Sequence, residues 1–158
     1  MNMHFLSLTI AFLLALTGIN HNPGIAAMNN TNENFQPVKT IVINSNDQMR
    51  FDTNEIRVKA GEKIKLTLNH TGKLPKNAMG HNFVLLEAGT DVAKFSQAAM
   101  NAKATEYIPS KGVIAHTKLI GGGESTTIEF TAPKKGTYEF ICSFPGHYAM
   151  MKGKFIVE

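Results

Sequence analysis

The sequence predicts an all-β fold, a Greek-key sandwich or barrel of about eight short strands with one short inserted helix. Two observations indicate this class. Apolar residues alternate with polar residues in several short segments, which is typical of strands with one buried face. Turns that contain Gly or Pro separate these segments, as at 60–62, 121–123 and 133–136. With 158 residues, the chain is long enough for one domain with a single core.

The predicted strands follow one another to the C-terminus. They are expected at 38–43, 55–60, 63–68, 81–86, 113–120, 126–131, 137–142 and 154–157. In the strand that ends at Cys142, this residue shares a face with Tyr138 and Phe140. We therefore expect the thiol to point into the core.

One segment has helical spacing. Between residues 91 and 103, the apolar residues Val92, Phe95 and Ala99 recur at intervals of three and four residues. Asp91 stands at the start, where a carboxylate caps the first turn and complements the helix dipole. The pattern predicts a single short helix inserted between strands.

The N-terminal 27 residues have the pattern of a secretory signal peptide. Residues 5–16 are almost uniformly apolar, and small residues follow at 24, 26 and 27. This run is shorter than the ~20 residues that a membrane span requires, and an uncleaved anchor is the alternative. We expect a signal peptide at 1–27, a flexible lead-in at 28–37 and a folded domain at 38–158. The mature protein would then be periplasmic, without stable membrane insertion.

Composition excludes several classes of function. The formal net charge is +4, but Lys and Arg are spread along the chain, whereas a nucleic-acid surface needs a basic patch. A single Cys excludes an internal disulfide as well as the zinc and iron–sulfur sites built from several cysteines.

The segment from Cys142 to Met151 contains most of the candidate metal ligands. It holds the only Cys of the chain, followed by His147 and Met151. Thiolate, imidazole and thioether suit copper in both redox states, and the Pro-Gly turn at 145–146 is compact enough to aim them at one point. His81, on a distant predicted strand, is the candidate for a second imidazole. Two His, one Cys and a weak axial Met form electron-transfer copper centres, which leave no position for a substrate.

Three other interpretations of these residues are open. Cys142 could be an inert buried thiol, the usual state of a lone core cysteine. Cys142 and His147 could form a nucleophilic pair, as in a Cys–His hydrolase, although no Asn or Asp stands out to orient the imidazole. The same copper site could also serve storage or sequestration without a redox partner. Met150 and Met151 are expected to face opposite ways in a strand, so that only one of them contacts the metal, and the spacing favours Met151.

Four segments closely resemble the azurin family. They are residues 46–51, 74–82, 113–121 and 142–153. The resemblance extends over essentially all of residues 38–158. The Cys-x4-His-x3-Met spacing is specific, since plastocyanin and pseudoazurin have a shorter Cys–His interval.

The resemblance implies a cupredoxin fold with one type 1 copper per chain, and a blue copper electron-transfer protein rather than an enzyme. It implies that His81, Cys142 and His147 are the strong ligands. Met151 and the backbone carbonyl of Gly80 would be weak axial contacts. The backbone N–H groups of two further residues, Asn82 and Phe144, would bond the thiolate and influence the potential.

Two positions depart from the azurin pattern. Val38 and Gly61 stand about where azurins carry a disulfide, whose loss typically costs ~2–5 kcal/mol in a small secreted domain. Phe83 replaces the core Trp of many azurins, and the chain has no Trp. Neither departure affects a ligand, so we expect only lower stability of the metal-free protein.

Apolar residues near the ligands in sequence predict a docking patch for redox partners such as cytochromes or periplasmic reductases and dehydrogenases. The patch comprises Leu74, Ala78, Met79, Phe144, Pro145, Ala149 and Met150. The azurin resemblance implies that it surrounds the exposed edge of His147. The protein would act as a monomer and bind no nucleic acid. His70 matches an azurin histidine whose protonation can couple to the potential, but a simple hydrogen-bonded role is equally compatible. His116 is expected at the surface.

Overall fold

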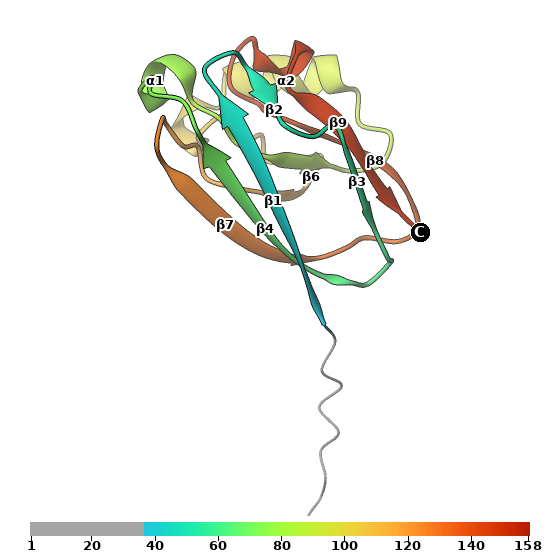
Figure 1. The fold of residues 1–158 in the computed structure, drawn as a ribbon. Coiled ribbons are helices and arrows are strands. Elements are labelled where there is room, and N and C mark those ends of the chain that lie inside the picture. Colours follow the sequence, from blue (N-terminus) through green and yellow to red (C-terminus); the bar gives the residue numbers. More distant parts are fainter. Residues whose placement is uncertain (1–36) are drawn as a thin grey trace, which may run out of the picture. The chain divides into compact units, whose positions relative to one another are not determined.

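The computed structural model describes residues 37–158. The predicted signal peptide, and all of the predicted lead-in except Pro37, lie outside the described residues. Within the described range, nine strands form two sheets that face each other, which confirms the predicted all-β sandwich (Figure 1).

The first sheet has four strands in the order β2-β1-β4-β7. These are β1 (Val38–Asn46), β2 (Arg50–Phe51), β4 (Lys63–His70) and β7 (Ser125–Thr131). The second sheet has five strands in the order β3-β9-β8-β5-β6. These are β3 (Glu55–Val58), β5 (Val84–Leu86), β6 (Val113–His116), β8 (Gly136–Ile141) and β9 (Lys152–Val157). Pairing is parallel for β1 with β4 and for β3 with β9, and antiparallel elsewhere in the two sheets.

The main core lies between the sheets, as the alternating pattern predicts. In β4, Ile64, Leu66 and Leu68 are buried, whereas Lys63 and Lys65 are exposed. The largest fully buried aromatic side chains of this core are those of Phe83, Phe140 and Phe155. Apolar burial on this scale supplies most of the folding free energy of a small domain.

Helix α2 (Val92–Met100) confirms the predicted helix. The Asp91 carboxylate accepts hydrogen bonds from the N–H groups of Ala93 and Lys94, at 3.0 and 3.1 Å. The buried side of the helix packs on the second sheet, where Phe95 joins a smaller apolar cluster. Its other members are Val84, Leu86 and Ile141. Because α2 covers the outer face, β5 is buried on both faces and does not alternate.

Other predicted boundaries were wrong. Only residues 84–86 of the predicted strand 81–86 form a strand, and His81 makes a single isolated bridge with Ile120. The strand predicted at 113–120 ends at His116. Elsewhere the strand bounds differ from the predictions by a few residues, and Cys142 follows β8 directly.

Four short elements lie outside the predicted set. They are β2, the single turn α1 (Lys76–Met79), and 3₁₀ turns at Lys103–Thr105 and His147–Ala149. Elements this short show no hydrophobic period, so the sequence does not signal them. Figure 1 shows α1, α2, β2 and the segment after β8 at the same end of the sandwich. Within residues 37–158, no helix has the length and apolar character needed to cross a membrane.

Candidate metal centre

The fold brings the three strong candidate ligands together at this end of the sandwich. One donor atom from each of His81, Cys142 and His147 lies within 4.8 Å of the other two, and all three residues are buried. Cys142 Sγ is 3.9 Å from His81 Nδ1 and 3.7 Å from His147 Nδ1. Nitrogen and thiolate bonds of about 2.0–2.3 Å in a trigonal arrangement would separate ligand atoms by roughly 3.5–4 Å. The donor set and its spacing therefore fit a metal ion.

His81 is positioned by segments far from it in the sequence. Its backbone N–H donates to the carbonyl of Ile120 and its carbonyl accepts from the N–H of Ile120, both at 2.9 Å. Its ring Nε2 is 2.9 Å from the carbonyl of Asn46, which can only accept, so Nε2 carries the proton. In the neutral ring, Nδ1 is then unprotonated and faces the thiol of Cys142, as metal binding requires.

His70 supports the ring of His81 from behind. The two rings stack with centroids 4.4 Å apart and an angle of 25° between their planes. His70 is buried, donates from Nε2 to the carbonyl of Met79 at 2.9 Å, and accepts at Nδ1 from the N–H of Gly72 at 3.0 Å. The structure thus places His70 against a ligand, while coupling of its protonation to the potential stays a prediction.

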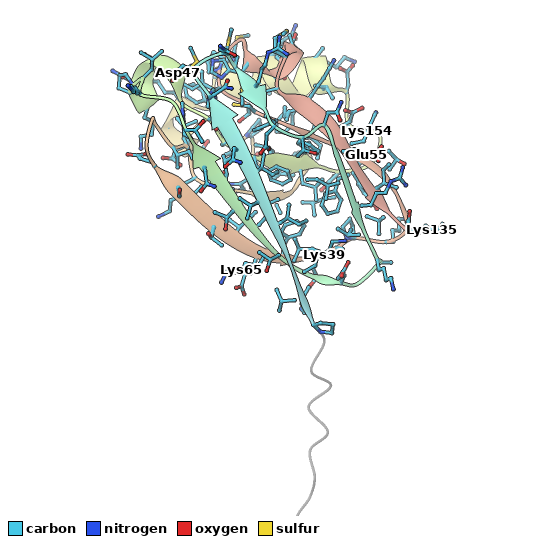
Figure 2. The ribbon with its side chains drawn as sticks, viewed as in Figure 1. Lys39, Asp47, Glu55, Lys65, Lys135 and Lys154 are labelled. Carbon is cyan, nitrogen blue, oxygen red and sulfur yellow. The ribbon has the colours of Figure 1, made fainter. Side chains whose placement is uncertain are left out.

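Asp47 fastens the loop after β4 to the turn between β1 and β2. Its carboxylate accepts from the backbone N–H groups of Lys73 at 2.8 Å and Leu74 at 3.2 Å. The hydrogen bond from Lys73 is the main reason that the pKa of Asp47 is lowered from its ordinary value. Figure 2 shows Asp47 at the end of the domain that carries α1, away from Lys39 and Lys65. Asn46, the last residue of β1 directly before this turn, supplies the carbonyl that holds His81.

The other ligands lie on a loop that is held mainly by its own hydrogen bonds. The N–H of Cys142 donates to the carbonyl of Met151 at 2.9 Å, and the N–H of Met151 donates to the carbonyl of His147 at 2.8 Å. The N–H of His147 donates to the carbonyl of Phe144 at 3.0 Å, across a turn in which Gly146 has a positive φ of 84°. Only Gly adopts that φ without strain.

Met151 is the methionine that the structure places inside. It is fully buried, whereas Met150 is 55% exposed, which confirms the choice between them. The expectation that both residues lie within a strand was wrong, because they lie between a 3₁₀ turn and β9.

Asn82 links the two parts of the site. Its side-chain oxygen accepts from the N–H of Ser143 at 2.8 Å, and its side-chain nitrogen donates to Ser143 Oγ at 2.9 Å. Burial raises the pKa of the Cys142 thiol to about 12, and hydrogen bonds from the backbone N–H groups of Asn82 and Phe144 oppose this rise. In the protein without metal, the thiol is therefore protonated, and these N–H groups stabilise the thiolate that a metal would bind.

Gly80 lies close to the thiol. Cys142 Sγ is 3.9 Å from the carbonyl oxygen of Gly80. A Cβ at this position would lie 2.5 Å from the carbonyl oxygen of Lys76, so only Gly fits. The position suits the expected weak axial contact of this carbonyl, which stays a prediction.

His147 differs from His81 in its surroundings. Its ring packs on that of Phe144, with centroids 4.7 Å apart, and 4% of the residue is exposed. Burial, followed by the nearby His81 and His70, lowers the pKa of His147 to about 4. Among residues 37–158, no hydrogen-bond partner contacts its Nε2, which therefore faces outward.

The residues of the predicted docking patch are accessible to different degrees. Leu74 and Met150 are 42% and 55% exposed, respectively. Of the other members, Ala78 and Ala149 are exposed, and Met79, Phe144 and Pro145 are half-buried. His116 is exposed on β6 and takes no part in the ligand cluster, as expected.

Sequence reasoning missed three supporting groups. They are the carbonyl of Asn46, the carboxylate of Asp47 and the side chain of Asn82. Each acts on a residue that is distant in sequence. The position of Asn82 directly after a candidate ligand was the only local signal that could have drawn attention to one of them.

The chain is similar to known copper proteins. Residues 38–158 match the family described as copper binding proteins, plastocyanin/azurin family. The azurin of Pseudomonas chlororaphis is 42% identical over 123 residues, which cover 73% of this chain and 95% of that protein. The outer membrane protein H.8 of Neisseria gonorrhoeae is 44% identical over 117 residues, or 71% of this chain. The match spans 63% of the length of H.8.

Solved structures show the same similarity. One is auracyanin A, a "blue" copper protein from the green thermophilic photosynthetic bacterium Chloroflexus aurantiacus. It is 32% identical with a TM-score of 0.71, over 77% of this chain and all of that one. Dithionite-reduced auracyanin from Roseiflexus castenholzii is 39% identical with a TM-score of 0.69, over 76% of this chain and 97% of that one.

Proposed function

This chain belongs to the plastocyanin/azurin family of copper-binding proteins, with a type 1 copper site at His81, Cys142, His147 and Met151, and we propose that it transfers single electrons between redox proteins. One observation carries the proposal. A buried thiol and two imidazole nitrogens converge within 4.8 Å of one another. When bound, copper supplies a one-electron change between Cu(II) and Cu(I).

The protein's contribution is to keep this ligand set fixed. The two oxidation states prefer different geometries, and a site that cannot rearrange changes little when an electron arrives. The bonds of His81 to Asn46 and Ile120 hold one imidazole, and the hydrogen bonds of the Cys142–Met151 loop hold the other ligands. A small change in geometry on reduction means that transfer is fast.

The surroundings of the site support a carrier rather than an enzyme. Five surface pockets within residues 37–158 have linings that include none of the four ligands. His81, Cys142 and Met151 are fully buried. A substrate would find no open position beside the metal, whereas an electron needs none.

The route for electrons runs through the outward edge of His147. His147 is the one ligand with surface in contact with solvent, and Phe144 of the docking patch packs against its ring. Exposed apolar patches of this kind mark docking sites, and small interfaces suit brief redox encounters. We assign the patch to redox partners such as cytochromes, reductases or dehydrogenases. We also assign the carbonyl of Gly80 as a weak axial contact of the copper.

We also propose that the protein is exported to the periplasm. The apolar residues 5–16, followed by small residues, support this placement. The name of the relative H.8, an outer membrane protein, points to export as well. Fractionation of cells that produce the full chain tests the placement, and recovery of the chain in the cytoplasm would contradict it.

The first experiment is to add Cu(II) to the purified domain and record its visible absorption. We expect an intense band from the copper–thiolate bond that is absent in Cys142→Ser. His116→Ala is the matched control, since it removes an exposed His outside the cluster and leaves the band unchanged. A colourless protein, or a band that survives loss of Cys142, would overturn the site.

The docking role has its own test. Met79→Lys places a charge in the patch and should slow electron exchange with a cytochrome while leaving the absorption unchanged. Val42→Lys is the control, because Val42 is 53% exposed on β1, outside the patch. Equal rates in the two variants would count against the patch.

A further inference from the structure

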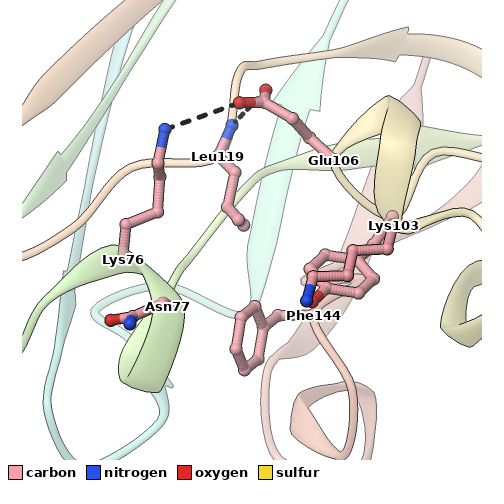
Figure 3. Close-up of a pocket in the computed structure, with 7 residues that line it drawn as sticks. Lys76, Asn77, Lys103, Glu106, Leu119 and Phe144 are labelled. Carbon is pink, nitrogen blue, oxygen red and sulfur yellow. Dashed lines mark hydrogen bonds and ion pairs between the residues drawn. The ribbon is translucent and has the colours of Figure 1, made fainter.

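A surface pocket of about 240 Å³ adjoins the docking patch (Figure 3). It shares the half-buried ring of Phe144 with the patch. Its lining comprises Lys76, Asn77, Lys103, Glu106, Tyr107, Leu119 and Phe144. The pocket is therefore next to the docking patch, with Phe144 common to both.

The pocket is connected to the ligand by aromatic contacts. The ring of Tyr107 meets that of Phe144 edge to face, with centroids 5.2 Å apart. Phe144 in turn contacts the ring of His147, with centroids 4.7 Å apart. A redox partner that docks against Tyr107 is therefore connected to the ligand His147 through the rings of Tyr107 and Phe144.

The charges of the pocket favour an anion. Lys76 and Lys103 both line it, and both are exposed. The one carboxylate, that of Glu106, is already engaged, since Oε2 accepts from the N–H of Leu119 at 2.9 Å and Oε1 is 3.7 Å from Lys76 Nζ. Figure 3 shows this carboxylate turned toward Lys76 and Leu119. The ammonium group of Lys103 has no ion pair or hydrogen bond with any residue in the range 37–158.

The backbone that builds this wall is unusual. Glu106 and Tyr107 have positive φ values of 56° and 66°, which are uncommon for residues other than Gly. The carbonyl of Glu106 accepts from the side-chain nitrogen of Asn82 at 3.3 Å. Asn82 also bonds Ser143 beside the thiolate ligand, so the pocket wall is fixed to the ligand loop.

We propose that this pocket receives surface carboxylates of an acidic redox protein, so that the docking surface selects acidic over basic partners. This inference rests on the proposed electron-transfer function. Lys103 and Lys76, which line opposite sides of the pocket, supply the attraction (Figure 3). Tyr107 and Phe144 form the apolar contact. Attraction between opposite charges at the edge of an interface acts mainly on the rate of encounter and on its salt dependence.

The test measures electron exchange between the copper-loaded protein and two c-type cytochromes, one acidic and one basic. In each reaction one electron passes from the reduced to the oxidised protein, and no bond is made or broken. The acidic cytochrome should react faster at low ionic strength, and the difference should shrink as salt is added. Lys103→Glu should slow the acidic cytochrome about tenfold at low salt.

Lys65→Glu is the matched control. Lys65 is exposed on β4, away from the end that carries α1, and the change alters net charge equally (Figure 2). We expect it to have little effect on either rate. Equal slowing by both variants would show that only net charge matters and would overturn the proposal. A basic cytochrome that reacts as fast as the acidic one would overturn it too.

A binding measurement that needs no copper completes the test. The redox-inert trianion hexacyanocobaltate(III), added to the metal-free protein, should shift the amide NMR signals of residues that line the pocket. Lys103→Glu should abolish these shifts, and shifts elsewhere instead would contradict the assignment. The copper–thiolate band is the separate check on the proposed function, since its absence overturns that function whatever the salt dependence shows.

Discussion

The two halves of the copper site are held in different ways. His81 is fixed by contacts with remote segments, namely the carbonyl of Asn46, the backbone of Ile120 and the ring of His70. Cys142 and His147 are fixed mainly by hydrogen bonds within their own loop. The first half depends on the packed sandwich, whereas the second is largely a local structure. Substitutions that affect one half can therefore leave the other intact.

The two Gly residues that precede the imidazole ligands give the largest expected contrast. Gly80 has an ordinary φ of −69° but no room for a Cβ, which would lie 2.5 Å from the carbonyl oxygen of Lys76. Gly146 has a φ of 84° but nothing within 4 Å of a Cβ. We expect Gly80→Ala to lower the free energy of unfolding by about 3 kcal/mol, at the upper end for overpacking. Gly146→Ala should cost about 1 kcal/mol in backbone strain.

Urea unfolding and copper absorption spectra of the two variants check this contrast. Gly80→Ala should also alter the spectrum, because the clash displaces His81 or α1. Gly146→Ala should leave it close to that of the parent protein. Equal costs in the two variants would mean that both halves are equally adaptable.

Lowering the pH should affect the imidazoles of His147 and His81 differently. Burial lowers the pKa of His147 to about 4 from 6.5, whereas the lowering at His81 is opposed by its hydrogen bond to Asn46. A depressed pKa means that the unfolded chain takes up the proton first. The metal-free protein should therefore be fully stabilised by this residue above pH 6.5 and lose stability as the pH falls toward 4.

We expect His147 to account for a loss of about 2 kcal/mol over this range, after allowing for solvent screening at its exposed edge. Thermal unfolding of the metal-free protein and of His147→Gln, at several pH values, measures the difference. The variant should show a shallower decline. An identical decline in both proteins would assign the effect to other groups.

A change at the axial position should have only a small effect on stability. Met151→Leu conserves volume in a fully buried position, so we expect a cost below about 1.5 kcal/mol. Loss of the weak thioether contact disfavours Cu(II) more than Cu(I), so the reduction potential should rise while the intense absorption persists. Met150→Leu, at the exposed neighbouring residue, is the control and should leave the potential unchanged. A potential unaffected in Met151→Leu would remove Met151 from the site.

The half of the site formed by the Cys142–Met151 loop could be predicted from the sequence, because its geometry is local. The spacing of Cys142, His147 and Met151, with a Pro-Gly turn between the first two, already limits where the three side chains can point. The inserted helix was predictable for the same reason, since Asp91 and the apolar spacing that follows it act within a few turns.

The half of the site that contains His81 could not be predicted without the tertiary structure. His81 was a good candidate by residue type and by resemblance, but the strand expected at 81–86 begins only at Val84. The groups that orient its ring, the carbonyl of Asn46 and the ring of His70, come from other parts of the chain. The expected alternation of buried and exposed residues is also absent from β5. The reason is that α2 covers the outer face, which a two-layer sandwich would leave to solvent.

The sequence alone thus determined the fold class, the ligand types and the local turn that groups three of them. Only the tertiary structure decided that β5 is buried on both faces, which carbonyl holds His81, and that Asn82 joins the two halves through Ser143. The physical reason is the distance along the sequence over which each kind of interaction acts. Spacing, capping and turn preferences act over a few residues. The hydrogen bonds and ring contacts that fix His81 instead join residues that only folding brings together.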